Sequence, residues 1–163
     1  MTTKVYTAMN AQINKELWSA YLYLSMSLYA NTIGRTGIGR WFYLQAVEEK
    51  EHARRLQKFM IDRDAQITLQ PIGSVPTSWN SIQEMFEQAL AHEQEITRSI
   101  HHLVTLAREE KDYAAEESLC WFVREQVEEE ATAKGILMDI QLAAGDPAAL
   151  LALDTKLGER NAS

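Results

Sequence analysis

The sequence predicts an all-α protein: a bundle of four long helices with one long crossover and a short fifth helix at the C-terminus. The 163 residues include only seven glycines and three prolines, so long stretches lack the residues that end helices. Apolar residues recur in these stretches with the 3.6-residue period of an α-helix. Four stretches have similar lengths of about 28–31 residues, and matched long helices pack best side by side.

We expect the first helix at about residues 4–33, because this stretch contains neither glycine nor proline. A glycine cluster that begins at Gly34 then predicts a turn. Thr36 is the predicted N-cap of a second helix at about 37–64. Prolines, glycine and serine in residues 65–79 predict an extended connection, which at about 3.3 Å per residue is long enough to cross the whole bundle.

The next two helices carry start signals. Ser81 and Glu84 form the pattern of a capping box, which predicts a third helix at about 81–110. Asp112 is the predicted N-cap of a fourth helix at about 113–143. Both helices run without proline, so each can span the full length of the bundle.

A short apolar segment ends the predicted fold. Asp146 and Pro147 are typical of an N-cap and a first helical residue, and they predict a fifth helix at about 147–157. Its apolar sequence AALLAL suggests that it docks against neighbouring subunits. The length fits one domain, residues 1–163.

Composition excludes several classes of protein. With 16 Lys and Arg against 23 Asp and Glu, the net charge of −7 disfavours nucleic acid as a partner. Cys120 is the single cysteine, so neither an internal disulfide nor a cysteine metal cluster is expected. The first residues do not resemble a signal peptide, and no apolar run approaches the roughly 20 residues of a membrane helix. We therefore expect a cytoplasmic protein with no membrane partner.

Six polar side chains fall on the apolar stripes of the four long helices, where bundle helices carry their core residues. Their spacing repeats, since E followed by E-x-x-H in the first half corresponds to E followed by Q-x-x-E 77 positions later. The repeat predicts two similar helical hairpins that bring these side chains to one level of the bundle interior. The six residues are Glu16, Glu49, His52, Glu93, Gln126 and Glu129.

The four glutamates among the six lack nearby positive charge. Burying carboxylates together costs free energy, because each loses hydration and like charges repel. No lysine or arginine stands three or four positions from any of them, although such pairs balance glutamates on solvated helix faces. Two divalent cations would neutralise four carboxylates, and carboxylates with one imidazole suit iron, manganese or magnesium. The residues therefore predict a dinuclear metal site.

Two segments around these residues, QAVEEKEHARRL and REQVEEEATA, closely resemble the bacterial non-haem ferritins of the ferritin-like di-iron family. The resemblance covers nearly the whole chain and implies the ferritin-like bundle. It also implies the ligands of one iron, which are Glu16, Glu49 and His52. The ligands implied for the second iron are Glu49, Glu93 and Glu129, with Gln126 lining the site. Those implied for a third iron nearby are Glu48, Glu125, Glu128 and Glu129.

The resemblance also implies a function, a ferroxidase that oxidises Fe(II) with O₂ or H₂O₂ and stores Fe(III) mineral in a homo-oligomeric cage of twenty-four subunits. No haem is expected, because Lys50 stands where the related bacterioferritins carry the haem-ligating methionine. Tyr23 and Trp121 match aromatic residues beside the centre, which donate an electron or simply pack. A di-iron peroxide reductase or oxygenase similar to rubrerythrin, without cage storage, is the alternative.

Overall fold

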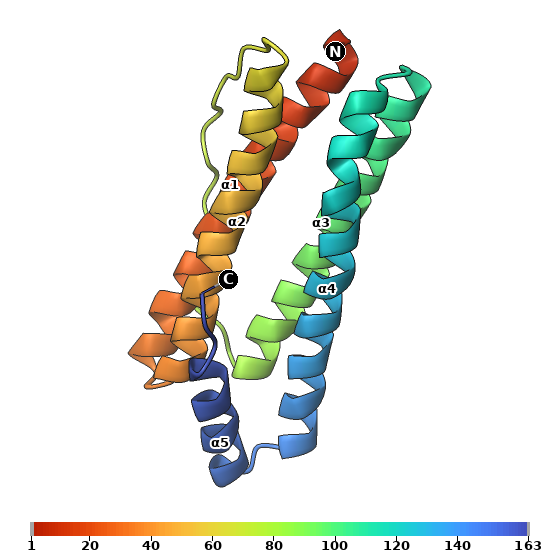
Figure 1. Ribbon diagram of the computed structural model, residues 1–163. Coiled ribbons are helices and arrows are strands. Elements are labelled where there is room, and N and C mark those ends of the chain that lie inside the picture. Colours follow the sequence, from red (N-terminus) through yellow and green to blue (C-terminus); the bar gives the residue numbers. More distant parts are fainter. Residues whose placement is uncertain (1, 163) are drawn as a thin grey trace.

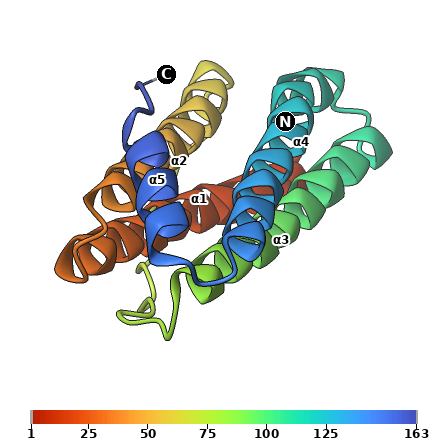
Figure 2. The same cartoon turned by 90° about the horizontal axis from the view of Figure 1, so that it is seen from below.

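The computed structural model describes residues 2–162, and five α-helices occur in that range. The four long helices lie as two hairpins, α1 beside α2 and α3 beside α4, with α5 at one end of the bundle (Figures 1 and 2). The predicted all-α bundle is confirmed. Within the described residues, no helix combines the length and hydropathy needed to cross a membrane. The helices are α1 (Thr3–Thr32), α2 (Thr36–Asp62), α3 (Ile82–Glu109), α4 (Tyr113–Ala143) and α5 (Pro147–Gly158).

A long crossover, residues 63–81, joins α2 to α3 and runs along α1 (Figure 1). Near its start, the side chain of Asn10 accepts a hydrogen bond from Thr68 N and donates one to Thr68 O, both at 2.9 Å. Near its end, Tyr29 Oη donates to the carbonyl of Trp79 at 2.7 Å. Because Asn10 and Tyr29 lie near opposite ends of α1, the crossover follows most of that helix, as its length predicts.

Apolar side chains form two clusters along the bundle. One contains Phe42 and Phe86 and includes the contacts with α5, and the other contains Leu56 and Ile100 toward the opposite end. In each long helix, the segment between its contributions to the two clusters carries buried polar residues. We call this level of the bundle the polar layer. Its side chains are therefore enclosed by apolar packing above and below, which lowers the local dielectric.

Three of the predicted helix starts have the expected cap. The side chains of Ser81, Asp112 and Asp146 accept hydrogen bonds from the backbone N–H groups three residues later, at 2.9–3.1 Å. Pro147 occupies the first turn of α5, as predicted. These caps satisfy donors that the helices themselves leave open, which explains why local sequence identifies the boundaries of α3, α4 and α5.

The start of α2 is different, and the predicted Thr36 N-cap is wrong. The helix begins at Thr36, and Arg35 at the cap position makes no capping hydrogen bond through its side chain. The cap comes instead from α5: the buried carboxylate of Asp154 accepts from Gly37 N at 3.3 Å and Ile38 N at 2.9 Å. A Cβ atom on Gly37 would lie 1.8 Å from the Asp154 carbonyl oxygen. The absence of a side chain at Gly37 therefore allows α5 to approach.

We expect Asp154→Ala to lower the free energy of unfolding by about 1–3 kcal/mol, because two buried N–H donors at the start of α2 lose their acceptor. Urea denaturation followed by circular dichroism measures this change. Asp139→Ala is the control, because Asp139 makes only a 3.7 Å surface ion pair with Lys156, and such pairs contribute little. Equal stability of the two variants would contradict the assigned role of Asp154.

Candidate metal centre

The structure places the six predicted side chains together in the polar layer. All four long helices contribute, and each of the six residues is at most 7% exposed. Such burial is uncommon for carboxylates unless they have partners. α1 supplies Glu16, α2 supplies Glu49 and His52, α3 supplies Glu93, and α4 supplies Gln126 and Glu129.

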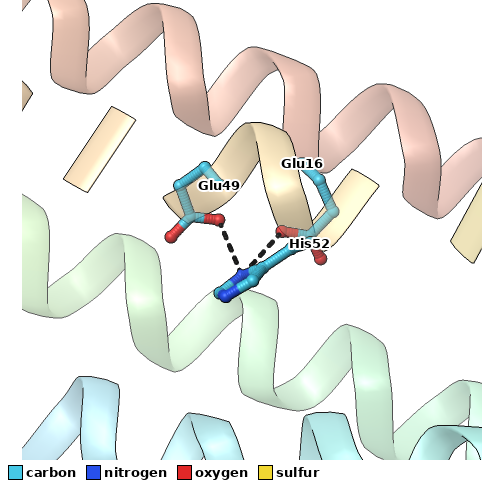
Figure 3. A group of neighbouring side chains, drawn as sticks. All are labelled: Glu16, Glu49 and His52. Atoms are coloured by element: carbon cyan, nitrogen blue, oxygen red, sulfur yellow. Dashed lines mark ion pairs between the residues drawn. The ribbon is translucent and has the colours of Figure 1, made fainter. Parts of the chain in front are cut away.

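The ligand atoms form two groups that share Glu49. In the first group, one ligand atom each from Glu16, Glu49 and His52 lie within 4.8 Å of one another. His52 Nδ1 is 3.3 Å from Glu49 Oε2 and 3.9 Å from Glu16 Oε2, as the dashed lines in Figure 3 indicate. The second group consists of Glu49, Glu93 and Glu129, whose ligand atoms also lie within 4.8 Å of one another. Two cations held by these groups would share the Glu49 carboxylate.

Two carboxylate oxygens of the first group have unused acceptor capacity. Among the described residues, no hydrogen-bond donor reaches Glu16 Oε2 or Glu49 Oε1, although both atoms are buried. A buried acceptor without a donor costs free energy. A divalent cation between these helices would supply the missing partner, so the donor set fits a hard metal ion such as iron.

Neutral amides orient two of the carboxylates. Gln12 Nε2 donates to Glu16 Oε1 at 2.8 Å, and Gln45 Nε2 donates to Glu129 Oε2 at 2.6 Å. Both glutamines are buried in the polar layer. The sequence assigns them no role, although their position on apolar stripes is the signal that could have identified them. Because their amides carry no charge, they fix the carboxylates without neutralising them.

Glu93 receives two further hydrogen bonds. Gln126 Nε2 donates to Glu93 Oε2 at 3.1 Å, and Tyr23 Oη donates to Glu93 Oε1 at 2.5 Å. Gln126 therefore contacts the centre through Glu93, and Tyr23 is directly hydrogen-bonded to a predicted ligand. Trp121 lies on the other side, with its ring centroid 5.4 Å from that of His52. Both aromatic residues adjoin the centre, as the sequence predicts.

The metal-free centre retains protons. Burial, followed by the charges of Glu93 and Glu16, raises the pKa of Glu49. Burial raises the pKa of Glu93 to about 7, although hydrogen bonds from Tyr23 and Gln126 oppose the change. Burial and the nearby Glu93 charge raise the pKa of Glu129 to about 8. Near neutral pH, carboxylates that would bind metal therefore hold protons that a cation must displace.

A third group lies beside the first two, where His52, Glu125 and Glu129 each place a ligand atom within 4.8 Å of the others. These residues line a cavity of about 640 Å³ between α2 and α4, which we call the inner cavity. Glu48 and Glu128 line the same cavity. Among the described residues, neither belongs to the 4.8 Å groups. The four acids predicted to bind a third iron thus share one cavity, and the geometry adds His52.

Four long helices around a buried layer of carboxylates and one histidine place the chain in the class of helical bundles whose facing helices carry side chains able to hold metal ions. Comparison with known proteins specifies the family. Residues 6–143 match the model of the ferritin-like domain. A bacterial non-heme ferritin of Bacteroides fragilis is 41% identical over 160 residues, which cover 98% of this chain and 99% of the relative. One from Staphylococcus aureus is 32% identical, covering 98% and 96%.

Solved structures agree with these relatives. The open pore ferritin of the archaeon Archaeoglobus fulgidus has a TM-score of 0.98 at 41% identity and covers 99% of each chain. A protein described as a humanized archaeal ferritin has a TM-score of 0.99 at 42% identity, covering 100% of this chain and 99% of the other. The chain belongs to the ferritin family.

We expect the stability of the metal-free protein to fall as pH rises from about 5 to 8. The pKa values of Glu93 and Glu129, about 7 and about 8 in the folded protein, lie above the roughly 4.3 of an unfolded glutamate. The folded state therefore binds more protons in this range, and its advantage disappears as both groups ionise, with a loss on the order of a few kcal/mol.

Urea denaturation of chelator-treated protein at several pH values measures this loss. The matched control is the double variant Glu93→Gln and Glu129→Gln, which removes these two titrating groups and should make the pH dependence between 5 and 8 less steep, with Glu49 still contributing. A wild-type stability that rises with pH over this range, or a double variant with the same slope as the wild type, would contradict the assignment.

Proposed function

We propose that this protein stores and detoxifies iron by oxidising Fe(II) to Fe(III) at a dinuclear site inside each subunit. The observation that carries the proposal is the pair of ligand groups that share Glu49 in the polar layer. Membership of the ferritin family and relatives named bacterial non-heme ferritins support it. Fe(II) is the substrate, and O₂ or H₂O₂ accepts its electrons.

In this proposal the residues act by position and charge. Glu16 and His52 bind one Fe(II), Glu93 and Glu129 bind the other, and Glu49 bridges them. Two Fe(II) ions give up two electrons, which reduce O₂ to H₂O₂ or H₂O₂ to water, and two protons are taken up. The carboxylates favour the product, because hard anionic oxygens stabilise Fe(III) more than Fe(II).

We further propose that twenty-four copies assemble into a cage that holds the Fe(III) mineral. Several large apolar side chains on the surface of the single chain support assembly, since exposed apolar residues in number mark interaction surfaces. On α5, Leu151 is 59% exposed, whereas Leu153 and Leu157 are buried within the subunit. On α4, Val127 and Leu142 are 68% and 81% exposed. The cytoplasmic location expected from the sequence stays a prediction.

The two candidate functions differ in capacity. A storage cage continues to oxidise and retain iron far beyond two ions per chain, whereas a di-iron peroxide reductase or oxygenase turns over with its iron in place. The match of nearly the full chain to ferritins favours storage. No separate observation in the structure favours the peroxide reductase.

We expect the purified apoprotein to oxidise many more than two Fe(II) per chain when oxygen is admitted, within a large hollow particle. Fe(III) absorbance and light scattering measure the two properties together. Oxidation that stops near two irons per chain on a small oligomer would favour the di-iron redox enzyme instead. An absence of protein-dependent oxidation would overturn the proposed metal centre.

We expect Glu49→Gln to slow Fe(II) oxidation by at least about tenfold, because the shared ligand loses its charge at both metal positions. Assembly should persist, since glutamine has nearly the same shape and the two apolar clusters are unchanged. Glu95→Gln is the control, because exposed Glu95 only pairs with Arg98 at 2.7 Å. Stopped-flow absorbance compares the initial rates, and a wild-type rate in Glu49→Gln would contradict the assignment.

A further inference from the structure

The C-terminal segment places an arginine in the inner cavity. Arg160 Nη2 lies 2.8 Å from Glu48 Oε2, and Arg160 Nη1 donates to Gln45 Oε1 at 3.0 Å and to the Trp41 carbonyl at 3.1 Å. Its guanidinium carbon is 4.8 Å from the centre of the Trp41 ring. The ion pair is largely withdrawn from water, with side chains 19% and 23% exposed. Arg160 is thus held by several specific contacts.

This arginine faces a strongly acidic surface. Besides Glu48, the inner cavity is lined by Glu51, Glu125, Glu128 and Glu129. Burial raises the pKa of both Glu125 and Glu129, and the charge of Glu48 adds a smaller increase because these carboxylates repel one another. A cation in the cavity relieves that repulsion, and Arg160 supplies one positive charge at Glu48.

The other guanidinium of the cavity lies elsewhere. Arg55 is positioned over the ring of Trp121, with its guanidinium carbon 4.0 Å from the ring centre. Arg160 instead pairs with Glu48 and also contacts Gln45, which orients Glu129. Trp121, on which Arg55 stacks, in turn contacts His52, whereas Arg160 pairs directly with a carboxylate of the cavity, Glu48.

We propose that Arg160 is a built-in counter-ion that competes with a metal cation for Glu48 and so weakens metal binding at the group of His52, Glu125 and Glu129. The inference rests on the proposed function, because it assumes that iron enters this centre. A divalent cation at the third group gains a further carboxylate only if Glu48 leaves Arg160. Arg160 is thus a positioning residue that makes the third metal ion bind more weakly than the first two.

The exchange requires little structural change. Arg160 lies two positions beyond the end of α5, in residues 159–162, which form no helix. Its backbone carbonyl accepts one long hydrogen bond from Arg40 Nε at 3.3 Å. The remaining contacts with α2 are made by its side chain, so a change of side-chain conformation frees Glu48 while α5 stays in place.

Anaerobic calorimetric titration of the assembled apoprotein with Fe(II) tests whether Arg160 competes with the metal ion for Glu48. We expect two tightly bound ions per chain and a weaker third in the wild type. Arg160→Gln should strengthen binding of the third ion by roughly tenfold, because Glu48 no longer has to give up a charged hydrogen-bond partner. Affinity for the ion held by Glu16, Glu49 and His52 should stay the same, because the contacts of Arg160 are with Glu48, Gln45 and Trp41.

Two further experiments distinguish competition for Glu48 from a general effect of the C-terminal segment. Arg124→Gln removes the same charge from an exposed position on α4 that does not line the inner cavity, and it should leave the third affinity unchanged. In a Glu48→Gln background, Arg160→Gln should have no effect on the third ion, because the carboxylate they compete for is gone. A purely structural role for Arg160 would change thermal stability without this dependence on Glu48.

Each result tests either the competition between Arg160 and a metal cation or the proposed dinuclear site. An unchanged third affinity in Arg160→Gln, or an equal gain in Arg124→Gln, overturns the competition while two tight ions still support the dinuclear site. A gain that persists in the Glu48→Gln background also overturns it. If the wild type binds no Fe(II) tightly, the proposed function itself fails.

Discussion

Mutual repulsion among buried carboxylates is the constraint on which the rest of this structure depends. Glu16, Glu49, Glu93 and Glu129 occupy one level of the bundle and are at most 7% exposed. An apolar cluster on either side keeps water away and strengthens the repulsion. Burial, with the charges of neighbouring glutamates as the smaller cause, raises the pKa of Glu49, Glu93 and Glu129 in the metal-free protein. The apolar clusters stabilise the fold, whereas the buried carboxylates of the polar layer lower the stability of the metal-free protein.

The topology explains how a single chain brings these groups to one level. The first helix of each hairpin contributes one glutamate, and the second helix contributes two polar residues three positions apart. The long crossover lets the second hairpin align with the first (Figure 1). A tight turn between α2 and α3 would make these helices antiparallel neighbours. The length of residues 63–81 and their contacts along α1 are therefore conditions for the site, because they determine how α3 and α4 lie against α1 and α2.

Periodicity predicted the bundle and the burial of the six residues, because both depend on spacing within a helix. Contacts between distant segments gave no such signal. Asp154 caps a helix that begins 118 positions earlier, and Arg160 reaches Glu48 across 112 positions. Neither contact follows from local sequence, which is why the predicted Thr36 cap is wrong and why Arg160 received no role. Gln45 lies on the buried face of α2, yet only the structure shows that it orients Glu129.

Positive charge is distributed unevenly around the centre, and this distribution separates two kinds of metal binding. Inside the polar layer, the hydrogen bonds to Glu16, Glu93 and Glu129 come from neutral amides and a phenol. These donors fix geometry and leave the negative charge available to cations. In the inner cavity, the guanidinium of Arg160 already pairs with Glu48. A cation that enters the two groups sharing Glu49 would therefore displace protons. A cation that recruits Glu48 would instead have to displace the side chain of Arg160, whose charge does not change with pH. Under the proposed function, metal binding at the two groups that share Glu49 would be coupled to pH, and binding that recruits Glu48 would be coupled to the conformation of the C-terminal segment, so the metal positions would fill in a fixed order.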